Sequence, residues 1–262
     1  MSNTTTKYLN TTREFAVNLA RSVRPLLQRH FRAPLDVTLK EDSSPVTIAD
    51  REVETVLRAA IRATFPEHAQ LGEELGGDVG EGWSWVVDPI DGTKSFICGV
   101  PLFGTLIALL HGGVPKLGVI DMPILDECWV GDSAATTWNG KPVRTSGCEE
   151  LGRARLFATS PDIFVGADRE AYERVSSSVA LRRYGGDCYL YGLLASGCCD
   201  LVIEADLKLY DVMALVPVVE GAGGVITDWD GQPLRQGFDG RVVAAATPAL
   251  HRAALHLLNE KA

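Results

Sequence analysis

Asp88-Pro89-Ile90-Asp91-Gly92-Thr93 directly follows the apolar run Trp85-Val86-Val87 and carries two carboxylates three residues apart. Magnesium takes oxygen ligands and often shares its coordination sphere with substrate phosphates. Asp88 and Asp91 can supply such oxygens. Gly92 has no Cβ, so its backbone can approach an anion closely. The hexapeptide therefore predicts one place that holds hard cations together with a phosphate.

The segments before this motif have the spacing of helices. Apolar residues recur on one face over residues 10–33, which predicts a helix that Pro25 kinks or divides. Residues 40–50 predict a loop into a second helix, with Asp50 as its N-cap and Pro66 as its end.

The motif itself and the segments after it alternate between strand and helix patterns. Residues 83–88 predict a strand and residues 93–98 a short helix. The pattern alone indicates a mixed α and β protein. Further strands are expected at 103–110, 116–121, 156–159, 181–184, 201–204 and 225–227, and further helices at 167–178, 189–196, 211–221 and 248–260.

The composition is that of an ordinary globular protein. Its 262 residues are 46% hydrophobic and 23% charged, enough for one large domain or two small ones. The formal charge of −9 argues against a nucleic-acid backbone as partner, because such a partner requires a basic face. Part of this negative charge is expected to belong to a metal site counted without its metals.

The cysteines and the apolar runs of the sequence indicate the cellular compartment of the protein. The six cysteines form no CxxC pair, and the five histidines show no zinc spacing. We predict reduced thiols in a cytoplasmic protein. The N-terminus lacks an apolar signal core, and no apolar run is long enough to cross a bilayer, so no membrane partner is expected.

Three further segments accompany the hexapeptide in a fixed order, namely Leu71-Gly72-Glu73-Glu74, Leu209-Tyr210-Asp211-Val212-Met213-Ala214 and Glu220-Gly221-Ala222-Gly223-Gly224-Val225. Together they resemble the inositol monophosphatase superfamily of metal-dependent phosphatases, from about Lys40 to Trp229. The resemblance implies a layered α/β fold with mixed sheets, the αβαβα sandwich of inositol monophosphatase and fructose-1,6-bisphosphatase. We expect a single domain over residues 5–262, with two αβ halves at roughly 5–150 and 151–262.

The resemblance also implies a metal site with two or three Mg²⁺. Glu73, Asp88 and the Ile90 carbonyl match one magnesium site, and Asp88, Asp91 and Asp211 match a second. Four carboxylates brought together without cations would repel each other and raise each other's pKa. Taken singly, each acid has a plainer explanation, because Asp91 could cap a turn, Asp211 could cap a helix and Glu73 could be an exposed acid.

The catalytic positions implied by the resemblance are Glu73, Thr93 and Asp50. The backbone N–H groups of Gly92 and Thr93 are expected to face the phosphate, aided by the N-terminus of a short helix. Thr93 matches the position that orients the attacking water, with Asp50 as its partner, and Glu73 matches a position that activates it. The expected chemistry is in-line attack by a metal-activated water without a phosphoenzyme. Asp50 could instead serve only as a helix cap.

Three further features resemble histidinol-phosphate phosphatases of the inositol monophosphatase type. They are Lys94-Ser95 before Phe96, an acid at Asp187 after Arg183, and the stretch through Glu204 to Asp211. Histidinol phosphate carries an ammonium and an imidazole, which Asp187 and Glu204 could bind by charge-assisted hydrogen bonds. The expected substrate-binding residues are Asp91, Gly92, Thr93, Lys94, Arg183, Asp187, Glu204 and Asp211.

Several of these residues have a second interpretation. Arg183 could bind phosphate, orient Asp187 or form a surface ion pair, and Asp187 could cap the helix from Tyr189. Glu204 also matches a contact of the inositol phosphatases, so it does not discriminate between the two substrates. Lys94 could simply be solvated.

The leading functional hypothesis is Mg²⁺-dependent hydrolysis of L-histidinol phosphate to L-histidinol and phosphate, in histidine biosynthesis. The first alternative is an inositol-1-monophosphatase or another phosphatase of small polyol or sugar phosphates. A non-catalytic metal-binding relative is a different class, and it requires a broken metal site. The family often forms homodimers, and the apolar segment after Pro101 could supply the interface.

Overall fold

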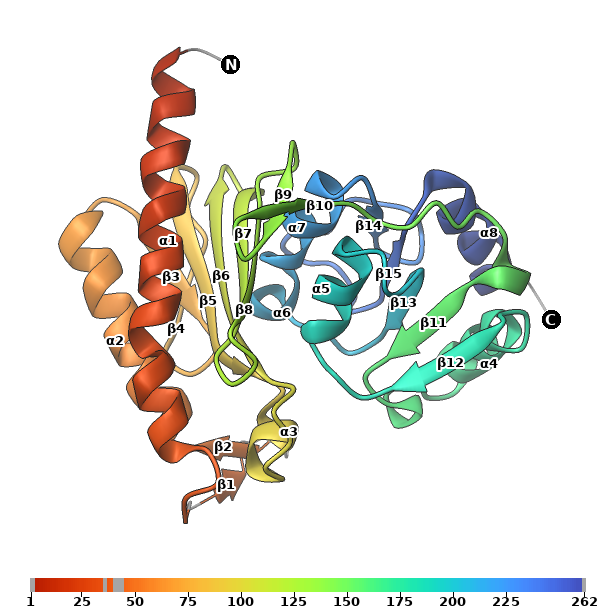
Figure 1. Ribbon diagram of the computed structural model, residues 1–262, viewed down its shortest axis with the longest axis horizontal. Coiled ribbons are helices and arrows are strands. Elements are labelled where there is room, and N and C mark those ends of the chain that lie inside the picture. The colour runs from red at the N-terminus through yellow and green to blue at the C-terminus, as the bar shows by residue number, and fades with distance from the viewer. Residues whose placement is uncertain (1–2, 35–36, 40–44, 261–262) are drawn as a thin grey trace.

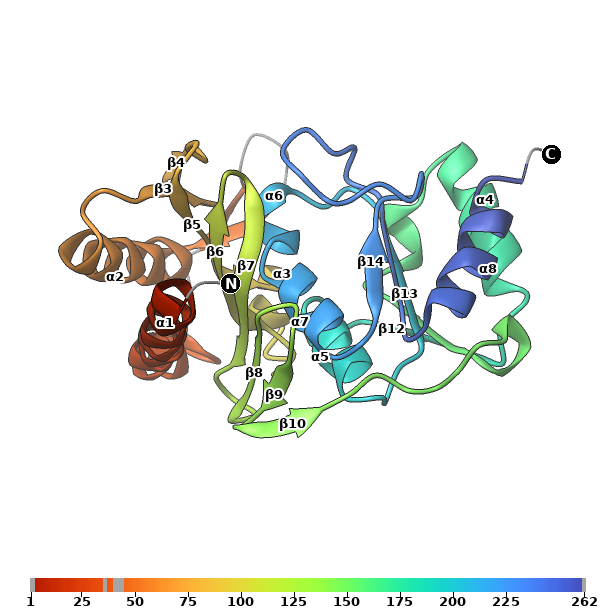
Figure 2. The same ribbon diagram turned by 90° about the horizontal axis from the view of Figure 1, so that it is seen from above.

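Five layers of helix and sheet follow one another along the long axis of the molecule (Figure 1). The computed structural model describes residues 3–34, 37–39 and 45–260. Two helices cover the outer face of an eight-stranded sheet, a helical layer separates it from a five-stranded sheet, and two helices cover the far side (Figure 2). The αβαβα sandwich with mixed sheets expected from the sequence is confirmed.

The helices divide among the three helical layers. The first layer holds α1 (Asn3–His30) and α2 (Ile48–Thr64), and the last holds α4 (Ala167–Ser176) and α8 (Pro248–Leu258). Three short helices lie between the sheets. They are α5 (Tyr189–Ala195), α6 (Leu209–Val212) and α7 (Leu215–Gly221); the remaining helical segments are α3 (Thr93–Ile97) and two 3₁₀ turns, η1 (Leu151–Arg153) and η2 (Pro161–Ile163).

The eight-stranded sheet has the order β10-β9-β8-β7-β6-β5-β3-β4 and is antiparallel except between β3 and β5. Its strands are β3 (Ala69–Gly72), β4 (Gly76–Gly77), β5 (Trp83–Asp91), β6 (Gly104–His111), β7 (Val114–Met122), β8 (Glu127–Gly131), β9 (Thr136–Trp138) and β10 (Lys141–Val143).

The five-stranded sheet has the order β12-β11-β13-β15-β14, with β11 parallel to both its neighbours. Its strands are β11 (Arg155–Ala158), β12 (Leu181–Tyr184), β13 (Leu201–Glu204), β14 (Val225–Thr227) and β15 (Val242–Ala245), and a separate two-stranded sheet pairs β1 (Val37–Leu39) with β2 (Pro45–Thr47).

Alternation along the central strand β6 builds two of the three cores. Leu106, Ala108 and Leu110 face the middle helical layer, whereas Ile107 and Leu109 face α1 and α2. Successive side chains of a strand point to opposite faces, so a nearly continuous apolar strand is buried on both sides. A third core lies between the five-stranded sheet and helices α4 and α8.

Helix α7 packs directly on the backbone of strands β7 and β8. A Cβ at Gly118 would lie 2.0 Å from the Ala214 carbonyl oxygen, and one at Gly131 would lie 2.4 Å from the Pro217 carbonyl oxygen. Only residues without a side chain permit this approach. The two glycines therefore set the distance between the first sheet and the middle layer, which carries one side of the candidate site.

Several local predictions need correction. The N-cap of α2 is Thr47, and Asp50 is the third helical residue of a capping box, so Asp50 as N-cap was wrong. Pro25 does not divide α1. The helix expected over 211–221 is two helices, α6 and α7, and the expected strands did not include β1 to β4, β8 to β10 or β15. Residues 40–44 of the expected loop lie outside the described part of the chain, whereas residues 45–47 form strand β2 and residues 48–50 begin α2, so the loop prediction was wrong over 45–50.

The division into one domain with two halves stays a prediction. Among the described helices, none combines the length and the apolar character that a bilayer crossing requires.

Replacing Gly118 by Ala is expected to lower the free energy of unfolding by about 1–3 kcal/mol, because the new methyl group collides with the backbone before α7. Urea denaturation measures the change. Gly147→Ala is the matched control, since a Cβ there meets no atom within 4 Å. Equal stability of the two variants would contradict this account of the packing.

Candidate metal centre

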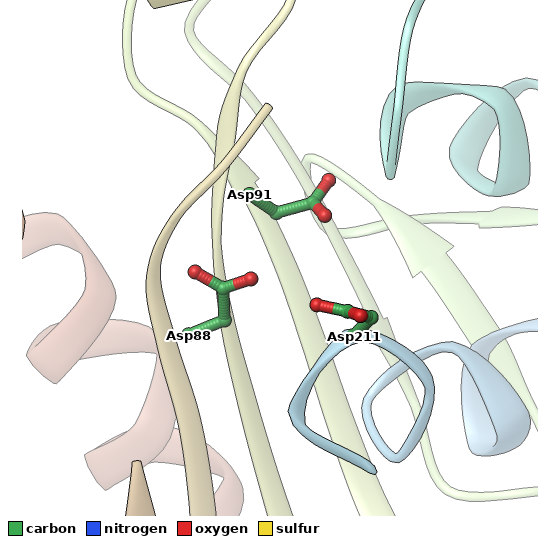
Figure 3. A group of neighbouring side chains, drawn as sticks. All are labelled: Asp88, Asp91 and Asp211. Atoms are coloured by element: carbon green, nitrogen blue, oxygen red, sulfur yellow. The ribbon is translucent and has the colours of Figure 1, made fainter. Parts of the chain in front are cut away.

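The carboxylates of Asp88, Asp91 and Asp211 converge on one point between β5 and α6. Their ligand atoms all lie within 4.8 Å of one another, and Figure 3 shows them around a common space. Residues three apart on a regular strand face opposite sides. The pairing of β5 with β6 shifts register between Asp88 and Asp91, and this irregularity allows both side chains to serve one site.

Each of these carboxylates uses one oxygen to accept a backbone N–H. Asp88 accepts from Ile90 at 3.0 Å, Asp91 from Cys188 at 2.6 Å, and Asp211 from Lys208 at 2.6 Å. These bonds fix the orientation of the three side chains without adding a positive charge. The site is thus preorganised while it remains strongly negative.

The electrostatics of the group call for a cation. Burial, followed by the neighbouring acids Glu73, Asp91 and Asp211, raises the pKa of Asp88 well above its ordinary value. Burial and the other acids also raise the pKa of Asp211, and burial with Asp187 raises that of Asp91 to about 7. Divalent ions remove this repulsion, and oxygen-rich donor sets suit hard cations. The residues present therefore fit a divalent metal.

Burial raises the pKa of Asp50, and the negative charge of the neighbouring Glu73 adds to this rise. Its Oδ2 accepts hydrogen bonds from the Thr47 backbone at 2.7 Å and hydroxyl at 2.6 Å. Its Oδ1 is buried and has no hydrogen-bond partner among the described residues. The capping role is thus observed, and one oxygen remains for a donor such as water.

Thr93 is oriented differently from the expectation. Its hydroxyl donates to the Ile90 carbonyl oxygen at 3.1 Å, and the described hydrogen bonds of Asp50 go to Thr47. The expected partnership of Thr93 with Asp50 is therefore not formed in this structure, while Thr93 does lie beside the expected metal ligand Ile90. Its role towards the attacking water stays a prediction.

Asp187 is held against the loop that begins α3. Its Oδ2 accepts the Ser95 hydroxyl at 3.1 Å, and a Cβ at Gly92 would lie 2.9 Å from the same oxygen. Gly92 has a φ of 88°, a conformation that glycine adopts readily. Burial raises the pKa of Asp187, whereas Ser95 and the exposed Lys94 oppose the rise. The acid predicted for substrate specificity thus lies next to the predicted phosphate loop.

A cavity of about 140 Å³ opens beside the metal-binding carboxylates. Glu204 forms part of its wall and accepts the Thr159 N–H at 2.5 Å through Oε1. Burial raises the pKa of Glu204 to about 8. Five of the twelve lining residues are acidic and none is basic; the lining is Asp91, Thr159, Ile163, Asp187, Cys188, Tyr191, Glu204, Ala205, Asp206, Leu207, Asp211 and Leu215.

Four predicted substrate contacts lie outside this lining, namely Gly92, Thr93, Lys94 and Arg183. Arg183 is exposed on β12, the edge strand of its sheet, and Lys94 is exposed on α3. Sequence reasoning in turn missed Tyr191 and Asp206, which do line the cavity. Asp206 belongs to the acidic stretch that precedes Asp211, so its place in the sequence could have identified it as a cavity residue. Tyr191 offered no such signal, because it sits in an apolar helical segment.

Comparison with known proteins places the chain among phosphatases. Residues 9–262 match the inositol monophosphatase family. A chloroplastic bifunctional phosphatase of Arabidopsis thaliana is 47% identical over 92% of this chain and 72% of its own length, and a histidinol-phosphatase of Chlorobaculum parvum is 35% identical over 91% and 93%. The solved structure of an inositol monophosphatase from Zymomonas mobilis superposes with a TM-score of 0.88, at 42% identity over 96% of this chain and 98% of the other.

Metal binding is expected to reverse a pH-dependent loss of stability. The folded-state pKa of Asp91 is about 7 against an ordinary 3.8, so the folded apoprotein holds extra protons between these values. Its contribution to stability is therefore present at acid pH and disappears as the pH rises to about 7. Bound Mg²⁺ compensates the ionised carboxylates. The gain in free energy of unfolding on adding Mg²⁺ should thus be larger near neutral pH than at about pH 5.

Urea denaturation with Mg²⁺ or with a chelator measures this difference. His251 acts in the opposite direction over an overlapping range, because burial lowers its pKa to about 4. His251 does not belong to the acidic cluster, so its effect cancels when the two conditions are subtracted. Asp91→Asn should reduce the loss of stability that the apoprotein shows with rising pH. It should also reduce the gain in free energy of unfolding on adding Mg²⁺. A Mg²⁺ gain that is the same at both pH values would contradict the metal site.

Proposed function

We propose that this chain, which belongs to the inositol monophosphatase family, hydrolyses L-histidinol phosphate to L-histidinol and phosphate. The observation that carries the proposal is the acidic cavity beside the metal-binding carboxylates. A relative with 35% identity is named a histidinol-phosphatase, which supports the same substrate.

The charge of the cavity favours a cationic leaving group. Asp187 and Glu204 face the space next to Asp91 and Asp211, and the lining contributes no basic side chain. Histidinol carries an ammonium and an imidazole, which can neutralise such acids through charge-assisted hydrogen bonds. A cation beside Glu204 favours the ionised form of this acid, whose pKa burial raises to about 8, whereas an uncharged polyol forms no such ion pair.

Two or three Mg²⁺ are proposed to bind at this site. Their proposed ligands are the Ile90 carbonyl and the carboxylates of Glu73, Asp88, Asp91 and Asp211. When bound, the ions supply positive charge for the developing oxyanion and lower the pKa of water. The chain contributes orientation, since backbone N–H bonds already fix Asp88, Asp91 and Asp211. This division of work suits hydrolysis of a phosphate monoester.

The phosphate is proposed to lie over the loop between β5 and α3. The backbone N–H groups of Gly92 and Thr93 begin that helix, and Lys94 adds a positive charge beside them. Glu73 is proposed to accept the proton of the attacking water. The unpartnered Oδ1 of Asp50 is available to orient water as well. Together these groups would hold the phosphorus in line for attack.

Inositol 1-phosphate is the second candidate substrate. The similar solved structure from Zymomonas mobilis is an inositol monophosphatase, and Glu204 suits either leaving group. A non-catalytic metal-binding relative is disfavoured, because the acids expected at the metal site are all present and three of them converge. Four further expectations stay predictions. They are a homodimer, a cytoplasmic location, a role in histidine biosynthesis and a substrate contact by Arg183.

Phosphate release in the presence of Mg²⁺ tests the proposal. We expect kcat/KM for histidinol phosphate to exceed that for inositol 1-phosphate by about a hundredfold, because two buried acids discriminate by charge. Removal of Mg²⁺ with a chelator should abolish both activities. Equal rates, or a preference for inositol 1-phosphate, would refute the proposed specificity and leave the metal-dependent chemistry in place.

Asp187→Asn tests the specificity residue. Asp187 has a φ of 47°, so Asn preserves both shape and backbone better than Ala does. We expect kcat/KM for histidinol phosphate to fall roughly tenfold to a hundredfold, while that for inositol 1-phosphate stays within about threefold. The control is Asp168→Asn on α4, whose ion pair with Arg241 lies outside the cavity lining. A parallel loss for both substrates would argue against charge recognition by Asp187.

A further inference from the structure

The hydroxyl of Tyr191 is buried in the wall of the acidic cavity and has no hydrogen-bond partner among the described residues. The side chain is only 2% exposed. A buried donor without an acceptor costs free energy, and phenylalanine would fill nearly the same space without that cost. The packing of α5 therefore does not account for the hydroxyl, which indicates a partner in another state of the site.

Acidic groups line the same cavity as Tyr191. Glu204 lies on the facing strand β13 and lines the same cavity. Burial, then Glu204, Asp91 and Asp211, hold the pKa of Tyr191 well above its usual range. The phenol thus stays protonated and can act only as a hydrogen-bond donor towards these carboxylates.

Among these carboxylates, Glu204 is the one that best suits a donor from Tyr191. Asp91 and Asp211 already accept backbone N–H groups and are required by the metal. Glu204 is held by Thr159 alone among the described residues, through its backbone N–H on Oε1 and its side chain, and it is not part of the metal-binding group. A carboxylate has about four lone-pair sites, so Glu204 can accept a further donor from Tyr191 and bind a ligand beside these contacts.

We propose that Tyr191 is a positioning residue that donates a hydrogen bond to Glu204 when the cationic part of the substrate enters the cavity. Thr159 and Tyr191 would then hold the ionised carboxylate from two sides and direct it at the ammonium or imidazole. The inference rests on the proposed function, in that the leaving group occupies the cavity beside Glu204. It adds a residue that contacts neither the phosphate nor the metal.

The test is Tyr191→Phe in the full chain with Mg²⁺. We expect KM for histidinol phosphate to rise about tenfold and kcat to stay within about twofold, because the lost bond acts on binding of the leaving group. Competitive inhibition by histidinol should weaken by a similar factor. Inhibition by inorganic phosphate should not change. Damage to the metal site would weaken phosphate inhibition as well, so this pair of inhibitors separates positioning from structural disturbance.

Tyr189→Phe is the matched control. Tyr189 lies on the same helix, and burial with the neighbouring Glu127 raises its pKa to about 12. It does not line the cavity. We expect no change in KM or in histidinol inhibition for this variant. Urea denaturation should show Tyr191→Phe to be at least as stable as the wild type, since it removes an unpartnered buried hydroxyl.

A double-mutant cycle with Glu204→Gln decides whether Tyr191 acts through Glu204. We expect the double variant to lose little more histidinol affinity than Glu204→Gln alone. Additive losses, or a Tyr191→Phe variant with unchanged KM, would overturn the inference. If the wild type prefers inositol 1-phosphate, the proposed function fails, and the same cycle is run with that ester and with inositol. A wild type that hydrolyses neither ester overturns both proposals.

Discussion

Repulsion between crowded carboxylates is the constraint on which the rest of this molecule depends. The ligand atoms of Asp88, Asp91 and Asp211 lie within 4.8 Å of one another, and each carboxylate accepts a hydrogen bond from a backbone N–H group. A folded protein tolerates such a group only if protons or cations neutralise it. The same negative charge that costs stability in the apoprotein supplies the affinity for divalent ions, so stability and metal binding are linked at a single point.

Segments distant in the sequence meet at this point. Strand β5 and the start of α3 come from the first half of the sequence, whereas Cys188 and Asp187 come from the second. The Cys188 N–H fixes Asp91 at 2.6 Å, and Ser95 donates to Asp187 at 3.1 Å. Gly118 and Gly131 allow α7 to lie against the first sheet, which keeps the middle helical layer close to these contacts. Packing that appears remote from the chemistry thereby determines the geometry of the site.

Metal binding and substrate selection use neighbouring but different acids. Asp88, Asp91 and Asp211 form the metal-binding group, while Asp187 and Glu204 face the cavity where a leaving group would lie. A fold shared by several phosphatases can thus keep its hydrolytic residues and change its substrate through the cavity wall. Tyr191 lines the same cavity as these acids, and its buried hydroxyl has no hydrogen-bond partner among the described residues.

The sequence by itself indicated a mixed α and β protein through its apolar periodicity, and the contiguous motif from Asp88 to Thr93 indicated a cation site. The layered fold, and the joining of Asp211 to that motif, came from resemblance to a known family, through segments that keep the same order along the chain. The sequence did not determine the cap of α2, which is Thr47 rather than Asp50, or the break between α6 and α7. Nor did it show that Arg183 is exposed and that Tyr191 lines the cavity. These facts depend on contacts between segments distant in sequence, and only the packed tertiary structure decides which side chains share a space and which buried groups lack a partner.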